Sequence, residues 1–270
     1  MKTRQKIFFA KLLAKVIFFF LRNSVFIVNR CNINWKLDIN EGIDLSIFVF
    51  GKFEDSIIKI SKHLISNKQI DIIDIGSNNG VHCLRLAENY KLSKIYAIEP
   101  TNYSYNKMIE NLSLNKNINN IFPFQYFLTD EEFKPDSIYS SWNLKSKEEK
   151  HALHMGIKKS ISNSKTISFD NFIIENKIQK KTLIKCDVDG NEMRVFNSGK
   201  NYFKKYKPYI IMELAPYLYK ENGYTSDELL QFLINLNYEF YEGNSFKKIS
   251  NIFDYASKIE NGSSVNIFLK

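Results

Sequence analysis

Residues 70–100, IDIIDIGSNNGVHCLRLAENYKLSKIYAIEP, constrain the fold of this chain most. An isoleucine-rich run, 70–75, leads directly into the glycine-bracketed turn 76–80, and residues 81–89 then carry apolar side chains at helical spacing. Glycines let the backbone approach a ligand closely, and the free N–H groups that open a helix favour polar ligand atoms. This strand, turn and helix therefore predict a nucleotide-binding edge of an α/β sheet.

The next predicted strand, 93–98, ends in Glu99 and Pro100. A carboxylate at this strand end can accept hydrogen bonds from both hydroxyls of a ribose, and its spacing suits NAD and S-adenosylmethionine (SAM) equally. A dinucleotide fingerprint counted from Gly76 needs glycine at 78 and glycine or alanine at 81, where this chain has Asn78 and Val81. The segment DIGSNNG, 74–80, instead resembles motif I of the SAM-dependent methyltransferases. The alternative is a purely structural turn in another α/β domain.

Alternating strands and helices continue along the chain. They predict a mostly parallel sheet with helices on both faces and an antiparallel pair at the C-terminus. Predicted strands are 120–129, 182–187, 208–213, 238–241 and 265–269, with a short extended piece at 48–51; predicted helices are 54–65, 102–115, 168–174, 191–202 and 226–235. The polar, lysine-rich insert 131–166 shows little periodicity and is expected to be either a lid or substrate loop, or simply mobile.

Cysteines and charge exclude several classes of protein. Three widely spaced cysteines without C-x-x-C spacing argue against a disulfide framework or a zinc site and fit a reducing cytosol. The formal net charge is +9, but eight basic residues and no acidic ones lie within residues 1–36. Outside that segment 30 basic residues face 29 acidic ones, so the body has no overall charge that would favour nucleic acid.

The segment 1–36 is predicted to be a basic amphipathic helix that precedes the main domain, 37–270. Four basic residues, Arg4, Lys11, Lys15 and Arg22, fall within an arc of roughly 40° on a helix that is otherwise rich in phenylalanine and leucine. Such a helix suits the surface of an anionic membrane, which gives a cytoplasmic protein attached peripherally to the inner membrane. A transmembrane span would need ~20 apolar residues, and no signal-peptide cleavage site follows. The alternative is a helix packed on its own domain or on a second subunit.

A second motif, IKCDVDGNE at 184–192, places acidic residues and Lys185 around the end of a predicted strand. Together with DIGSNNG, the IEP of 98–100 and the KPYIIMEL of 207–214, it resembles the FkbM-type family of SAM-dependent methyltransferases. The resemblance covers roughly residues 53–241. It implies the class I methyltransferase fold with seven strands, SAM as cofactor, and usually an oxygen acceptor on a sugar or secondary metabolite. Ser77 stands in place of the family's usual alanine, and Asp189 in place of its glutamate.

The resemblance assigns roles to individual residues. Asp74, Gly76, Asn78 and Gly80, with Ser77 among them, are expected at the methionine part of SAM. Glu99, followed by Pro100, is expected at its ribose, and Asp130 at its adenine. Asp187 lies where the methyl group would be delivered.

A sugar hydroxyl is a poor nucleophile, so a positioned base is expected, and Asp187 is the candidate. Glu213 is expected to orient the acceptor, and Lys185 to keep Asp187 ionised. Two readings of this cluster stay open. Lys185, Asp189 and Glu192 can form ion pairs and a helix cap without a catalytic role, and Asp187 with Asp189 can bind Mg²⁺. His151 and His154, three residues apart in the insert, are weak metal candidates because no acid or cysteine accompanies them at ligand spacing.

The predicted function is transfer of a methyl group from SAM to a hydroxyl of a sugar, glycan or lipid-linked saccharide. The alternatives are methylation of another small molecule or of nucleic acid, or a cofactor-binding scaffold without catalysis that is recruited by its N-terminal helix.

Overall fold

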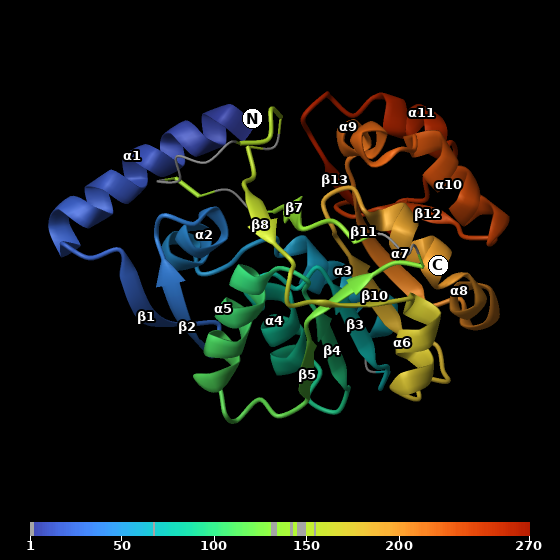
Figure 1. The fold of residues 1–270 in the computed structure, drawn as a ribbon, viewed down its shortest axis with the longest axis horizontal. Helices are drawn as coiled ribbons and strands as arrows, with labels where there is room; N and C mark the ends of the chain where they lie inside the picture. Colours follow the sequence, from blue (N-terminus) through green and yellow to red (C-terminus); the bar gives the residue numbers. More distant parts are fainter. Residues whose placement is uncertain (1–2, 67, 131–133, 141–142, 145–149, 154) are drawn as a thin grey trace.

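The computed structural model describes residues 3–66, 68–130, 134–140, 143–144, 150–153 and 155–270 (Figure 1). Its centre is a seven-stranded sheet in the order β12-β13-β11-β10-β3-β4-β5. All neighbours are parallel except β13, which runs antiparallel to both β11 and β12. The strands are β3 (Ile72–Ile75), β4 (Ile95–Ile98), β5 (Ile121–Phe124), β10 (Leu183–Cys186), β11 (Tyr209–Leu214), β12 (Phe240–Glu242) and β13 (Val265–Leu269). This is the mostly parallel sheet with a closing pair that the sequence predicted.

Helices cover both faces of the sheet, as expected (Figure 1). Successive residues of a strand point to opposite faces, so Ile72 packs in the core with α3 (Ser56–Ile65) and α4 (Val81–Asn89), and Ile73 in the core on the other side. The first face also carries α5 (Asn102–Ser113). The second carries α6 (Phe169–Glu175), α7 (Glu192–Ser198), α8 (Lys200–Tyr206), α10 (Ser226–Asn235) and α11 (Ile252–Ser257). Side-chain caps from Thr101, Ser168 and Thr225 begin three of these helices.

Three predicted elements differ from the structure. The helix expected over 191–202 divides into α7 and α8 at Gly199, where a Cβ would meet Phe169 Cδ1 at 2.4 Å. The strand expected over 120–129 divides after β5, and its second part, β6 (Tyr126–Leu128), leaves the sheet to pair with β9 (Lys165–Ile167). Residues 48–50 are not extended. They end α2 (Gly42–Phe50), which stops at Gly51 with φ +73°.

The insert is more regular than its sequence suggested. It contains an antiparallel pair, β7 (Ser137–Tyr139) with β8 (Lys158–Ser160), and β8 packs on α5. These strands are only three residues long, too short to leave an alternating pattern in the sequence. Two further short elements, α9 (Pro216–Tyr219) and the 3₁₀ helix η1 (Lys220–Asn222), follow β11.

The N-terminal helix is shorter than expected. α1 (Thr3–Leu21) is followed by a hairpin of β1 (Val25–Arg30) and β2 (Ile33–Asp38), which turns at Cys31 and Asn32, both at positive φ. β2 belongs to the body, because its alternate residues Ile33, Trp35 and Leu37 are buried. Its backbone N–H groups at Asn34 and Lys36 donate to the side-chain oxygens of Asn115 and Asn111 beside α5. The hairpin is therefore part of the body, and α1 alone precedes it.

Candidate active site

Both sequence motifs meet at one cavity of about 320 Å³ at the carboxyl ends of β3, β4, β10 and β11. Gly76 and Asn78 reach it from the turn after β3, Glu99 and Pro100 from the end of β4, and Asp187 from the end of β10. Ligands of open α/β sheets bind in this position, outside the carboxyl ends of the strands. The structure therefore gathers residues that lie more than a hundred positions apart in the chain.

The turn 76–80 packs directly against the second motif. Gly76 has φ +79°, and a Cβ on it would lie 1.9 Å from the backbone oxygen of Asp187, so only glycine fits there. Gly80, at φ +88°, immediately precedes α4, so no side chain lies between the turn and the helix. Ser77 is fully buried, and its hydroxyl donates to the Asp74 carbonyl oxygen at 2.8 Å. Ser77 therefore braces the turn and is not among the residues that line the cavity.

Glu99 is buried on the cavity wall and accepts three hydrogen bonds from the protein. Its Oε1 accepts from the backbone N–H and the hydroxyl of Thr101, and its Oε2 accepts from the Asn78 N–H at 2.9 Å. Burial raises the pKa of Glu99 above its ordinary value, and these hydrogen bonds oppose the rise. A carboxylate has about four acceptor positions, so one remains for a ligand hydroxyl.

Replacing Glu99 with alanine is expected to weaken SAM binding by about 1.5–3 kcal/mol, because a charge-assisted hydrogen bond to the ribose is lost. Isothermal calorimetry on folded protein measures this. The matched control is Glu110→Ala, which removes an exposed carboxylate of α5 that pairs with Lys36. Unchanged SAM affinity in a folded Glu99→Ala protein would refute the ribose assignment.

Lys185 lies at the centre of the second motif and is almost fully buried. Its Nζ donates to the Gly76 carbonyl oxygen at 2.7 Å and lies 3.4 Å from Asp74 Oδ1 and 3.5 Å from Asp187 Oδ2. Burial opposes the charge on Lys185, but the carboxylates of Asp74 and Asp187 outweigh it and raise the lysine pKa. The ammonium group therefore holds the first turn, the strand before it and Asp187 together.

Asp74 and Asp187 occupy different environments on either side of this lysine. The Asp74 side chain is fully buried and does not line the cavity, and neither of its oxygens has a hydrogen-bond partner among the described residues. Asp187 lines the cavity with 29% of its side chain exposed. Asp74 therefore balances the charge of Lys185, whereas Asp187 is open to a ligand.

Further carboxyl groups surround Asp187. Burial first, then the charges of Asp187 and Glu54, raise the pKa of Glu213 well above its ordinary value, and the Ser264 hydroxyl donates to its Oε1. Burial and the neighbouring charges of Asp187 and Glu192 likewise raise the pKa of Asp189. The negative charge of Asp187 therefore disfavours ionisation of both neighbouring carboxyl groups.

The pH dependence of the free energy of unfolding tests the electrostatic environment of Glu192. Burial raises its pKa from 4.5 to about 7, although it accepts hydrogen bonds from the Val188 N–H and the Tyr224 hydroxyl. Between these two pH values the folded protein binds the proton more tightly than the unfolded chain does. The free energy of unfolding should therefore fall by about 3 kcal/mol as pH rises from 4.5 past 7.

Glu192→Gln should flatten that decline, because the amide does not titrate. Urea unfolding of both proteins between pH 5 and pH 8 measures the difference. Equal slopes for the wild type and the variant would show that Glu192 does not titrate in this range.

Two cavity residues, Glu54 and His82, were not predicted from the sequence. His82 is buried in the first turn of α4, and its Nε2 lies 3.6 Å from Glu54 Oε2. The other ring nitrogen, Nδ1, has no hydrogen-bond partner among the described residues. The sequence signal for His82 was its position two residues after Gly80, because the first turn of a helix that begins at a ligand site faces that site.

Asp130 is not brought to the site. It is exposed and lies outside the set of cavity-lining residues, so the structure offers no support for its predicted contact with adenine. His151 pairs with Glu221, at 2.6 Å between Nε2 and Oε2, and His154 lies outside the described residues. Within the described residues no three His, Cys, Asp or Glu side chains converge to hold a metal ion, and Asp187 with Asp189 forms no such group.

Comparison with known proteins identifies the family. Residues 74–240, more than half of the chain, match the Methyltransferase FkbM domain. The chain belongs to this family. It is a SAM-dependent methyltransferase, as the two motifs and the strand order indicated. No curated protein matches the sequence.

Three solved structures resemble this FkbM-family protein at low sequence identity. The FkbM methyltransferase of Methylobacillus flagellatus KT has 12% identity and a TM-score of 0.46 over 81% of this chain, which spans only 48% of that protein. TYW2 of M. jannaschii in complex with AdoMet has 16% identity and a TM-score of 0.42, covering 92% of this chain and 84% of that one. The fibrillarin/Nop5p complex has 12% identity and a TM-score of 0.44, covering 79% and 78%.

The cavity of this family member offers polar groups that suit SAM. SAM carries positive charge on its sulfonium and ammonium groups, and the cavity wall is rich in carboxyl groups: Glu54, Glu99, Asp187, Asp189 and Glu213. Glu99 has an open acceptor position for a ribose hydroxyl, and Gly76 and Asn78 of the first motif line the same cavity. The residues present therefore fit the cofactor.

Proposed function

We propose that this protein transfers a methyl group from SAM to a hydroxyl oxygen of a carbohydrate, either a sugar, a glycan or a lipid-linked saccharide. The observation that carries the proposal is the position of Asp187. It is the partly exposed carboxylate of the cavity that is paired with the buried ammonium of Lys185. A weakly nucleophilic hydroxyl needs such a base, whereas a more nucleophilic nitrogen or thiolate acceptor needs it less.

When bound, SAM supplies the methyl group, whose bond to sulfur breaks, leaving the electron pair on sulfur, as the acceptor oxygen forms its new bond to carbon. Asp187 takes the hydroxyl proton in this step. Lys185 Nζ, 3.5 Å from Asp187 Oδ2, holds that carboxylate in place, and Glu213, on the same cavity wall, orients the acceptor through its carboxyl group. Holding the acceptor in line with the breaking bond contributes part of the ~7–11 kcal/mol that proximity can supply.

The competing acceptor is nucleic acid. The charge-neutral body argues against it, because affinity for nucleic acid depends on basic residues that neutralise phosphates. A scaffold without catalysis is opposed by the Asp187–Lys185 pair, which a binding module would not need at its cofactor site.

Incubation of the purified protein with SAM carrying an isotopic label in its methyl group tests the proposal. The host's polysaccharide, lipid, protein and nucleic-acid fractions are offered as acceptors in parallel. Mass spectrometry should find a labelled methyl ether on a sugar oxygen. Label in nucleic acid or protein alone would overturn the carbohydrate assignment while leaving methyl transfer intact.

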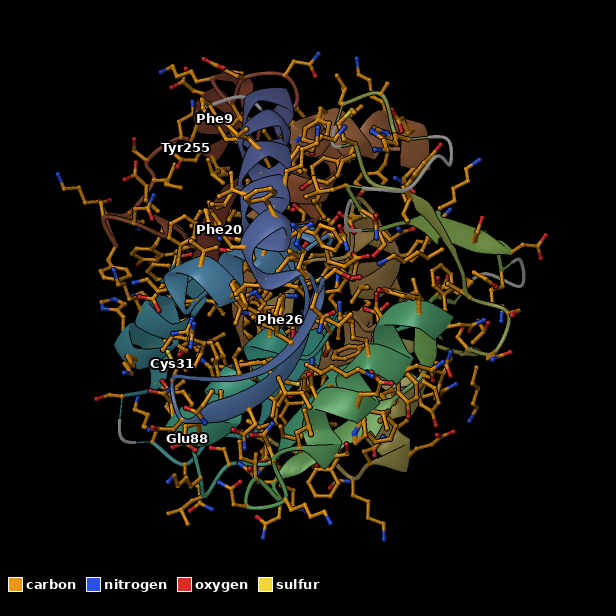
Figure 2. The ribbon with its side chains drawn as sticks, turned by 90° about the vertical axis from the view of Figure 1, so that its left-hand side faces the viewer. Phe9, Phe20, Phe26, Cys31, Glu88 and Tyr255 are labelled. Atoms are coloured by element: carbon orange, nitrogen blue, oxygen red, sulfur yellow. The ribbon has the colours of Figure 1, made fainter. Side chains whose placement is uncertain are left out.

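We also propose that α1 attaches the protein to the surface of an anionic membrane. One side of α1 packs on the body through Ala10, Ala14 and Ile17, against Ile39 and Leu45. The residues that face outward are large and apolar: Phe9, Leu12, Val16, Phe18, Phe19, Phe20 and Leu21. Figure 1 shows α1 along one edge of the molecule, and in Figure 2 Phe9 is near one end of this helix and Phe20 near the other.

The charge of α1 supports an anionic lipid surface as the partner of this face. Lys11, Lys15 and Arg22 flank the exposed apolar residues, and Phe20 exposes 74% of its surface. Two further large apolar side chains, Ile27 on the hairpin and Phe50 on α2, are exposed by 67% and 68%. No helix within the described residues is long and apolar enough to cross a membrane. The proposed attachment is therefore peripheral, at the cytoplasmic face.

Reversing two charges, Lys11→Glu with Lys15→Glu, should release the protein from vesicles that contain phosphatidylglycerol. Each basic residue near an anionic surface contributes about 1 kcal/mol, so the lost attraction alone lowers partitioning roughly 30-fold. Vesicle sedimentation measures this, with Lys204→Glu and Lys205→Glu on the exposed side of α8 as the matched control. Equal binding by the wild type and the reversal would show that the basic residues of α1 do not hold the protein on the membrane.

A chain that begins at Asn23 should lose vesicle binding and keep SAM binding. A chain that begins at Asn40 should not fold well, because it also lacks the buried Ile33, Trp35 and Leu37 of β2.

A further inference from the structure

A second cavity, of about 240 Å³, adjoins the proposed SAM site. Three residues, Ile138, Asp189 and Asn191, line both cavities. Asp189 and Asn191 follow Asp187 within the same motif, so the two cavities meet beside the proposed base. A molecule held in the second cavity therefore needs to extend only past Asp189 and Asn191 to approach Asp187.

One wall of the second cavity is the aromatic ring of Tyr139 on β7. The His151 ring packs edge-on against it with ring centroids 5.0 Å apart, and Lys158 Nζ lies 5.3 Å from its centroid. These two neighbours fix the orientation of the Tyr139 ring. An immobilised aromatic surface that lines a cavity suits a flat ligand with apolar C–H groups on one side, such as a sugar ring.

Another wall consists of three interlocked polar side chains. Arg194 Nη1 donates to Asn191 Oδ1 at 2.6 Å and lies 3.5 Å from Asn222 Oδ1. The Asn191 and Asn222 amides donate in turn to the carbonyl oxygens of Val188 and Leu218, at 3.0 and 3.1 Å. All three groups are planar, and their own hydrogen bonds hold them in place. Because their orientation precedes ligand binding, less conformational entropy is lost when a ligand binds.

The insert contacts η1 beside this cavity. His151 Nε2 lies 2.6 Å from Glu221 Oε2, which joins two segments seventy residues apart, and the His151 side chain is buried. Arg194 and Lys158 offer donors, Asp189 and Glu221 offer carboxyl oxygens, and the two asparagines offer both. Such a mixture matches a neutral ligand with several hydroxyl groups better than an anionic or an oily one.

We propose that the second cavity is the acceptor site and that it binds one ring of the carbohydrate acceptor. The ring packs on Tyr139, its hydroxyls bond to Arg194, Asn191 and Asn222, and an adjacent hydroxyl passes Asp189 to reach Asp187. The inference rests on the proposed function and adds to it the location and chemical class of the acceptor.

The test uses the full chain in the presence of S-adenosylhomocysteine, which fills the cofactor site without allowing turnover. Methyl glycosides of glucose, galactose, mannose, rhamnose and N-acetylglucosamine serve as probes, with binding measured by saturation-transfer NMR and calorimetry. At least one should bind. Tyr139→Leu and Arg194→Lys should each lower its affinity about tenfold or more, since one removes the ring surface and the other the planar fork. SAM affinity should stay unchanged in both.

The matched control is Tyr255→Leu, which changes a half-buried tyrosine on α11 outside both cavities. This variant should bind the glycoside normally. Arg194→Lys keeps the test valid if Tyr139→Leu does not fold. Failure of all five glycosides to bind, or equal affinity in the wild type and the folded variants, would overturn the acceptor site. Failure to bind SAM would instead overturn the proposed function, so the two failures are distinguishable.

Discussion

Asp187→Asn is expected to lower turnover by roughly 10²–10⁴-fold, the contribution that a positioned general base makes to proton transfer. SAM affinity should remain within a few-fold of the wild type, because the role proposed for Asp187 is on the acceptor, whereas the proposed cofactor contacts are Glu99, Gly76 and Asn78. Initial rates on the carbohydrate fraction that accepts labelled methyl groups, together with calorimetry of SAM, measure both quantities.

The control is Asp254→Asn, which removes one negative charge from an exposed carboxylate on α11. A near-normal kcat in Asp187→Asn would place the base elsewhere in the cavity, with Glu54 and Glu213 as the next candidates. Loss of wild-type activity on addition of EDTA, with recovery in Mg²⁺, would instead make Asp187 a metal ligand.

Lys185→Met is expected to destabilise the folded protein by about 3–5 kcal/mol, the usual effect of removing one partner of a buried ion pair. Asp74 would then be fully buried without its ion-pair partner, and its oxygens accept no hydrogen bond among the described residues. Urea unfolding with circular dichroism measures the change. Lys258→Met, whose lysine is exposed on the surface, should change stability by less than about 1 kcal/mol.

The double variant Lys185→Met with Asp74→Leu should recover most of this stability, because an apolar pair of similar volume replaces both charges in the core. Activity should stay low in the double variant, because Asp187 still lacks its cation. Recovery of activity together with stability would show that Lys185 has only a structural role. Equal destabilisation by Lys185→Met and by the double variant would contradict the charge balance between Lys185 and Asp74.

Local signals predicted much of this fold. The helix at 81–89 has the expected bounds, because glycine on one side and apolar residues at regular spacing define it within the sequence. The ends of β4 and β10 were also expected, and with them the meeting of Glu99 and Asp187, since strand ends of a parallel sheet share one edge. Motif and topology together therefore predicted which residues face the cavity from these strands.

Features that depend on distant contacts were missed. The Phe169 ring, thirty residues before Gly199, leaves no room for a Cβ there, and Glu54, which precedes α3, lies beside His82 in the first turn of α4. Asp74 and Ser77 belong to the motif but do not line the cavity, because Asp74 is buried against Lys185 and the Ser77 hydroxyl donates back to the backbone. The second cavity takes its walls from β7, α7 and η1, and no local pattern joins these segments.

Calorimetric titration of the purified protein with SAM and, separately, with NADH tests the central claim that the cavity between the two motifs binds SAM. We predict saturable binding of SAM that weakens in Glu99→Ala, with no measurable binding of NADH. Preferential binding of NADH, or the absence of any SAM binding by the folded protein, would contradict the account.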